Sequence, residues 1–214
     1  RGVLLYTSAD DRVSTDSHIG GAGRPIDQKA FEPFYERVAH HDVPIWLHPA
    51  RPRTTPDYVG ELDSKYLIWQ MFGWPFEVAA AMARLVFSGL MDRHDLTVIA
   101  HHAGSLVPFL ADRMSVHYDL FESTGENYGG NQPKPYADLF KQFYADTATF
   151  GNVPALRTAY EFFGADHLLF GTDSPFDAEG GDISTQVNKT AVESLDIHDA
   201  EREQIAASTI ESII

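Results

Sequence analysis

Five short apolar runs, each followed by an amphipathic stretch, constrain the fold of this chain more than any other feature. The runs are GVLLYT (residues 2–7), VPIWLH (43–48), LTVIAHH (96–102), FYADTA (143–148) and HLLFGTD (167–173). Their apolar residues are continuous rather than alternating, which is typical of strands buried on both faces of a parallel sheet. A strand followed by a helix, five times in succession, predicts parallel βα units.

Helices are expected between and after these strands. The expected ranges are 29–41, 75–91, 105–122, 154–163, 184–195 and 199–213. The fourth begins at Pro154 and stops before Gly164, which are typical start and stop residues of a helix. Three connections are long enough to carry function or to cap a site, namely 8–27, 49–74 and 123–138.

Two architectures contain such parallel units, an open doubly wound sheet and a (β/α)8 barrel. No glycine-rich phosphate loop follows the first strand, which counts against a nucleotide-binding open sheet. A complete barrel needs roughly 250 residues, whereas this chain has 214. The chain also starts next to a strand and stops inside a helical pattern, so we expect it to be part of a longer one.

Composition narrows the class of protein. With 43% hydrophobic and 22% charged residues, the chain is typical of a globular protein. A formal net charge of −15 argues against nucleic-acid and membrane partners. The absence of cysteine excludes disulfides, zinc–thiolate sites and thiol catalysis. The sequence has no apolar run of transmembrane length and no signal-peptide pattern, which predicts a cytoplasmic enzyme.

Histidine and aspartate residues gather where the expected strands end. They are His48, the pair His101 and His102, Asp146, and Asp173. In α/β folds the carboxyl ends of parallel strands share one rim, so these side chains should converge. Neutral imidazoles and carboxylates are ligands for Zn²⁺, Mn²⁺ or Fe²⁺. Each residue alone has an ordinary structural explanation, such as a hydrogen-bonded histidine or a capping aspartate, but the four strand ends together favour a site.

The sequence is similar to the amidohydrolase-2 family along nearly its whole length. This group of (β/α)8 barrels includes decarboxylases of the aminocarboxymuconate-semialdehyde, γ-resorcylate and 5-carboxyvanillate types. The matching segments are VPIWLHPARP, LTVIAHHAGSLVPFLADR, YADTATFGN and LLFGTDSPF. The combination of H-x-G-x-x-x-P-F with G-T-D-x-P-F is more specific than either motif alone.

The resemblance implies a role for particular residues. His48 is implied as a metal ligand, and Asp173 as both a metal ligand and a proton-transfer group. Counting back from Pro108 implies that His102 is the catalytic acid or base, and strand alternation then turns His101 toward the layer between barrel and helices. Arg113 is implied to bind a substrate carboxylate from a neighbouring subunit. A surface ion pair with Asp112 or Glu122 is the alternative explanation of Arg113.

One departure from the family pattern is large. Family members carry H-x-H, two further metal ligands, at the end of the first strand, and this sequence contains no H-x-H. The five strands correspond to strands 4–8 of the barrel. We therefore expect residues 1–214 to form a single barrel domain of the metal-dependent hydrolase type, incomplete at both ends and lacking strands 1–3.

The leading hypothesis is a metal-dependent, non-oxidative decarboxylase of an aromatic or muconate-like carboxylic acid. It would use Zn²⁺, with Mn²⁺ as the alternative, and would form a homodimer or homotetramer. Phe176 and Trp46 would line the substrate pocket. Two alternatives remain, a metal-dependent hydrolase of a lactone or amide that uses the same residues, and a degenerate barrel without catalytic activity.

Overall fold

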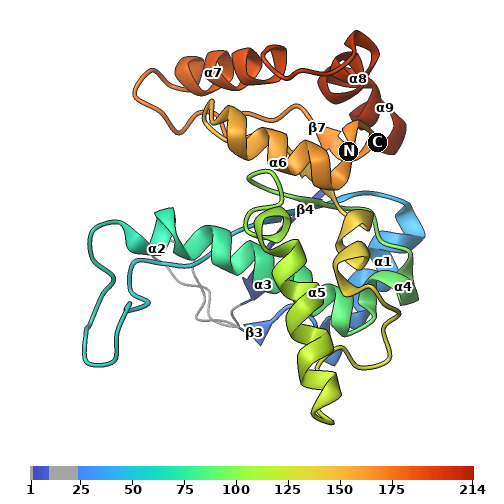
Figure 1. Cartoon of the computed structure of the whole chain (residues 1–214). Coiled ribbons are helices and arrows are strands. Elements are labelled where there is room, and N and C mark those ends of the chain that lie inside the picture. Colours follow the sequence, from blue (N-terminus) through green and yellow to red (C-terminus); the bar gives the residue numbers. More distant parts are fainter. Residues whose placement is uncertain (1, 10–23) are drawn as a thin grey trace.

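A parallel sheet of five strands forms the centre of the molecule (Figure 1). The structure is a computed structural model that describes residues 2–9 and 24–214. The strand order is β1-β4-β5-β6-β7, the same as the order along the chain. The strands are β1 (Val3–Tyr6), β4 (Ile45–His48), β5 (Val98–Ala100), β6 (Tyr144–Asp146) and β7 (Leu168–Leu169). A short antiparallel pair, β2 (Ser8–Ala9) and β3 (Arg24–Pro25), lies beyond the end of β1.

Helices follow the strands as the sequence predicts. They are α1 (Glu32–His41), α2 (Ile68–Met71), α3 (Gly73–Phe87), α4 (Leu90–His94), α5 (Val107–Ser123), α6 (Val153–Phe163), α7 (Asp182–Glu193), α8 (Asp199–Glu203) and α9 (Thr209–Ile213). Short 3₁₀ turns cover Lys29–Phe31, Tyr136–Gln142 and Ala165–His167, and a π-helical turn at Gln204–Ser208 joins α8 to α9. Within the described residues, no helix is both long and apolar enough to cross a membrane.

The strand and helix predictions are confirmed, with differences in two helices. The helix expected over 199–213 is interrupted by the π-helical turn at Gln204–Ser208, which separates α8 from α9. The single helix expected over 75–91 is two helices, α3 and α4, because Gly89 between them adopts a left-handed conformation with φ +73°. The long connection 49–74 contains the short helix α2, which the sequence did not predict. Most of the expected connection 8–27 lies outside the described residues.

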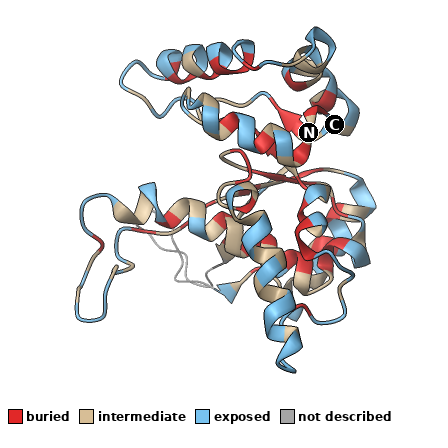
Figure 2. Ribbon diagram, in the orientation of Figure 1, coloured by how far each residue is buried: buried red, intermediate tan, exposed pale blue. Residues whose placement is uncertain are grey.

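The core lies between one face of the sheet and the helices. Leu5, Leu47, Ala100 and Leu168 belong to it, together with buried side chains from α1, α3, α4, α6 and α7. Figure 2 shows the same division on α7, whose side toward α6 is buried and whose far side is exposed. Burial of this apolar surface is the main force that holds the helices on the sheet.

The opposite face of the sheet is covered less completely. Alternation of side chains places Leu4, Trp46, Ile99 and Tyr144 there, in one row across four strands. Ile99 is buried, whereas Trp46 and Tyr144 are partly exposed and Leu4 is 53% exposed. In a closed barrel this face would point toward the barrel interior.

A left-handed turn links β5 to α5. His102, Ala103, Gly104 and Ser105 have consecutive φ values of +56°, +55°, +70° and +57°. A residue with a Cβ atom loses roughly 1–2 kcal/mol in this conformation, so the surroundings must hold the turn in place. At Gly104 there is a second constraint, since an added Cβ atom would lie 2.5 Å from a ring carbon of Phe163.

We therefore predict that Gly104→Ala destabilises the chain more than the same change at Gly125. Both glycines are left-handed, but a Cβ atom on Gly125 would have nothing within 4 Å. Gly125→Ala should lower the free energy of unfolding by about 1–2 kcal/mol, and Gly104→Ala by roughly 1–3 kcal/mol more because of the collision with Phe163. Urea denaturation measures both, and equal losses would contradict the prediction.

Candidate active site

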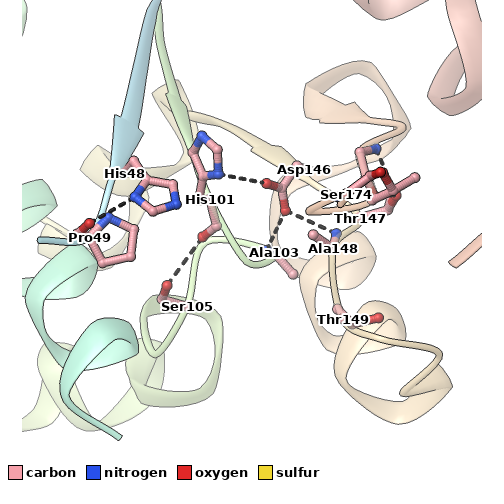
Figure 3. A network of polar contacts seen from close by, with 12 residues as sticks. His48, Pro49, His101, Ala103, Ser105, Asp146, Thr147, Ala148, Thr149 and Ser174 are labelled. Carbon is pink, nitrogen blue, oxygen red and sulfur yellow. Dashed lines mark hydrogen bonds and ion pairs between the residues drawn. The ribbon is translucent and has the colours of Figure 1, made fainter. Parts of the chain in front are cut away.

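The parallel register places four polar or aromatic side chains in a row at the carboxyl end of the sheet. Tyr6 pairs with His48 directly. Leu47 pairs with Ala100, and Ala100 pairs with Ala145. The residues that follow these three along their strands, His48, His101 and Asp146, are therefore also neighbours. All lie on the face of the sheet opposite the main core, as the alternation of side chains requires. Figure 3 shows His48, His101 and Asp146 side by side.

The imidazole of His48 has one nitrogen assigned to a hydrogen bond and one available. Its Nδ1 lies 2.7 Å from the carbonyl oxygen of Pro49. A carbonyl only accepts, so Nδ1 carries the proton and Nε2 keeps a lone pair. Burial lowers the pKa of His48. A neutral imidazole with a free Nε2 is the form that binds a metal ion.

Aromatic rings surround His48 on two sides. Tyr6 and Trp74 make edge contacts with it at ring-centroid distances of 5.8 and 5.7 Å. The indole nitrogen of Trp74 donates to the carbonyl oxygen of Arg51, 2.9 Å away, which fixes that ring in turn. Trp74 comes from α3 and Tyr6 from β1, so two separate elements orient the histidine.

His101 lies between His48 and Asp146. Its ring centroid is 4.9 Å from that of His48, and its Nδ1 is 3.4 Å from Oδ2 of Asp146. Burial lowers the pKa of His101, and the nearby negative charge of Asp146 acts in the opposite direction. The prediction that strand alternation turns His101 toward the helix layer is wrong. His101 keeps the alternation of β5 and faces the site, and the left-handed turn begins only at His102.

His102 and Asp173 complete the cluster. The ring of His102 is 6.3 Å from that of His48 and 6.0 Å from that of His101. Asp173 follows β7 with φ +56°. Burial raises the pKa of Asp173, while the charges of His102 and His48 act in the opposite direction, as expected for groups that face one another.

The structure does not bring Arg113 or Phe176 into this cluster, whereas the ring of Trp46, the other residue expected to line the pocket, lies 6.3 Å from that of His101. Arg113 lies on an exposed part of α5, and within the described residues no ion pair joins it to a carboxylate. Glu122, one of its suggested partners, instead pairs with Lys134 at 2.5 Å. Phe176 is 73% exposed.

The donor atoms present fit part of a metal site. Within residues 2–9 and 24–214, no group of three histidine or acidic side chains is arranged to hold a metal ion. His48 offers a free Nε2 atom and Asp173 a carboxylate, and these are the two ligands that the sequence predicts. They match the residue types of a mixed nitrogen and oxygen site but leave it short of ligands.

Three site residues were not predicted from the sequence. His101 was assigned to the wrong side, and Tyr6 and Trp74 were not considered. Tyr6 was accessible to prediction, because it is the last apolar residue of the first run and therefore stands close to the strand end, as His48 does in the second run. Nothing in the pattern around Trp74 indicates that α3 would bring it against His48.

The loop after Asp173 is organised by one carboxylate. Asp177 accepts hydrogen bonds from the backbone nitrogens of Glu179, Gly181 and Ser184 at 2.8, 3.0 and 2.7 Å. These bonds, led by that from Ser184, lower the pKa of Asp177 from 3.8 to about 2. The carboxylate therefore ties the segment that carries Asp173 to the first turn of α7.

Comparison with known proteins identifies the family. The amidohydrolase family model Amidohydro_2 matches residues 1–211. The chain belongs to this amidohydrolase family, and the predicted fold, strands of a parallel (β/α)8 barrel, is confirmed by the solved structures that resemble it.

Similar proteins include several decarboxylases. A 6-methylsalicylic acid decarboxylase from Penicillium expansum is 28% identical over 77% of this chain and 48% of its own length. The apo structure of IDCase from Metarhizium anisopliae is 30% identical, with a TM-score of 0.75 over 100% of this chain and 56% of that one. A dihydroxybenzoic acid decarboxylase from Polaromonas sp. JS666, with bound manganese and the inhibitor 2-nitroresorcinol, is 25% identical with a TM-score of 0.73, over 98% of this chain and 59% of that one. The chain spans about half the length of the curated relatives it matches.

The low pKa of Asp177 leads to a pH-dependent prediction. A depressed carboxyl pKa stabilises the folded state above the ordinary pKa, and that contribution is lost as pH falls through the folded value. Asp177→Asn should lower the Tm by a few degrees at pH 7, and the gap to the unsubstituted chain should shrink between pH 3.8 and about 2. Thermal melts across this range test it. Glu179→Gln, which removes a nearby exposed charge, should show little change, and a gap independent of pH would refute the assignment.

Proposed function

We propose that the protein is a metal-dependent, non-oxidative decarboxylase of an aromatic or muconate-like carboxylic acid. The observation that carries this proposal is the convergence of His48, His102 and Asp173 at one end of the sheet. The names of two relatives reported above support the reaction type, since they are decarboxylases of 6-methylsalicylic acid and of dihydroxybenzoic acid. The substrate would be a carboxylate on an aromatic or conjugated carbon.

Each residue has a separate task in this proposal. Asp173 delivers a proton to the carbon that bears the carboxylate. The bond from that carbon to the carboxylate then breaks, CO₂ leaves, and the bonding electrons return to the ring or conjugated system. His102 acts as a general base toward the substrate or orients a water. When bound, the metal would supply Lewis acidity toward a substrate oxygen.

We also propose that residues 1–214 form strands 4–8 of an eight-stranded barrel. The missing ligands would then come from an H-x-H segment in three preceding βα units. Two observations support this. Leu4 is exposed on the face of the sheet that would point into the barrel, and the chain spans only about half the length of its curated relatives. We propose Zn²⁺ as the metal, with Mn²⁺ as the alternative, held by His48 and Asp173 together with that segment.

Arg113 is proposed to serve the site of a second subunit, in a homodimer or homotetramer. It shares an exposed stripe of α5 with Phe109 and Val116, at spacings of four and three residues. Phe109 is 79% and Val116 64% exposed, so the stripe offers apolar surface that an interface between subunits could cover. An interface over this stripe would bury them and bring the guanidinium to the neighbouring rim, where it would bind the substrate carboxylate.

The decarboxylase proposal predicts a specific loss in the full-length protein. His48→Ala should release bound metal and reduce CO₂ formation from 2,6-dihydroxybenzoate by a factor on the order of 10² or more. Asp173→Asn should abolish CO₂ formation because it removes both a ligand and the proton donor. Metal analysis and a CO₂ assay measure the two effects, and Asp138→Asn is an exposed control. Lactone or amide cleavage without CO₂ release would favour the hydrolase instead, and full activity in both variants would refute both enzymes.

The Arg113 proposal predicts complementation between subunits. Arg113→Ala and Asp173→Asn should each be inactive alone, the first through a higher KM. Mixed oligomers of the two variants contain some sites with an intact Asp173 and a neighbour's intact Arg113, so part of the activity should return. Co-expression followed by the same assay tests this. If no activity returns in verified mixed oligomers, Arg113 does not act across subunits.

A further inference from the structure

We infer that Asp146 is a positioning residue that holds the turn bearing His102 at the rim of the site. This inference rests on the proposed function for its catalytic consequence, but its structural part is independent of it. The contacts of Asp146 are with His101, Ala103 and Ala148, none of which is a proposed metal ligand. Asp146 acts on His102 through the two residues that flank it, His101 and Ala103.

The carboxylate of Asp146 is buried, and each of its two oxygens has at least one polar partner. Only 4% of the residue is exposed. Its Oδ1 accepts hydrogen bonds from the backbone nitrogens of Ala103, at 3.1 Å, and Ala148, at 3.0 Å. Its Oδ2 faces Nδ1 of His101 at 3.4 Å. One side chain of β6 thus binds the chain on each side of His102, at the residue before it and the residue after it (Figure 3).

The turn needs such a support because of its backbone conformation. His102 and Ala103 are left-handed non-glycine residues at the start of a left-handed run. The contacts inside the turn are few, with the amide of Ser105 donating to the carbonyl of His102 at 2.7 Å and the Ser105 hydroxyl donating to the carbonyl of His101 at 3.2 Å. The bond from Ala103 to Asp146 fixes the turn to the neighbouring strand, β6. A strained conformation persists only where its surroundings determine it.

The end of β6 also holds the segment that follows β7, its neighbour on the side opposite β5. The hydroxyl of Thr147, which is fully buried, accepts from the amide of Gly171 at 3.1 Å and donates to its carbonyl at 3.0 Å. A Cβ atom on Gly171 would lie 2.9 Å from Cβ of Asp146, so glycine allows this close approach. Gly171 lies two residues before Asp173. Asp146 and Thr147 therefore connect the segment of His102 with the segment of Asp173.

The consequence is a fixed spacing between the two groups that would move protons. A displacement of about 1 Å in such a group can reduce a rate by a factor on the order of 10² without weakening substrate binding. Removal of the Asp146 carboxylate should accordingly reduce kcat and leave KM nearly unchanged. A purely structural role would lower the Tm but would leave kcat of the folded protein intact.

The experiment compares three variants of the full-length protein in the CO₂ assay. Asp146→Ala removes every contact and should reduce kcat by a factor on the order of 10². Asp146→Asn retains one oxygen for the two backbone amides and replaces the charged acceptor oxygen that faces His101 with a neutral amide nitrogen, so it should recover much of that loss. Leu195→Ala empties a buried position of the hydrophobic core and is the matched control for destabilisation, with a lower Tm and an unchanged kcat.

Hydrogen exchange of the backbone amides supplies a readout that does not need activity. The amides of Ala103 and Ala148 should be protected in the unsubstituted protein and in Asp146→Asn, and should exchange faster in Asp146→Ala but not in Leu195→Ala. A kcat in Asp146→Ala equal to that of an active unsubstituted protein would overturn the inference, as would unchanged protection of Ala103. If the unsubstituted protein releases no CO₂, the proposed function fails alone, and the exchange result then decides whether Asp146 holds the turn.

Discussion

The parallel register of β4, β5 and β6 is the constraint on which the site depends. Because Leu47, Ala100 and Ala145 are paired across these strands, the next residues His48, His101 and Asp146 must be neighbours on the same face. A shift of one residue in any strand would send its polar side chain into the helix layer and bring an apolar one to the rim. The hydrophobic core therefore determines which chemical groups meet.

Each strand end adds a different kind of local support to this arrangement. His48 is oriented by a carbonyl oxygen and by two aromatic rings, and Asp146 by two backbone amides. Asp177 orders the loop after Asp173 in a similar way, by accepting backbone hydrogen bonds. These supports come from backbone groups that any sequence would supply, and from a few side chains of the right length to reach them.

Most of the fold could be predicted from the sequence, and part of the site. Continuous apolar runs and regular helical spacing are local signals, so the strands and most helices were found where expected. The break at Gly89 was missed because a glycine inside a helical pattern does not by itself disclose a left-handed conformation. His101 was misassigned because a count from Pro108 places His102 at the site but says nothing about which residue still belongs to the strand. Contacts such as Trp74 against His48 depend on tertiary packing.

The two aromatic neighbours of His48 have a consequence for how the site would take up a ligand. Tyr6 and Trp74 limit the rotation of the imidazole, and Pro49 selects the nitrogen that stays free. A mobile histidine would lose side-chain entropy when it binds a ligand. For His48 this entropy is already lost when the chain folds. His48 is thus preorganised, and its affinity for whatever it coordinates depends in part on the packing of Tyr6 and Trp74 against its ring.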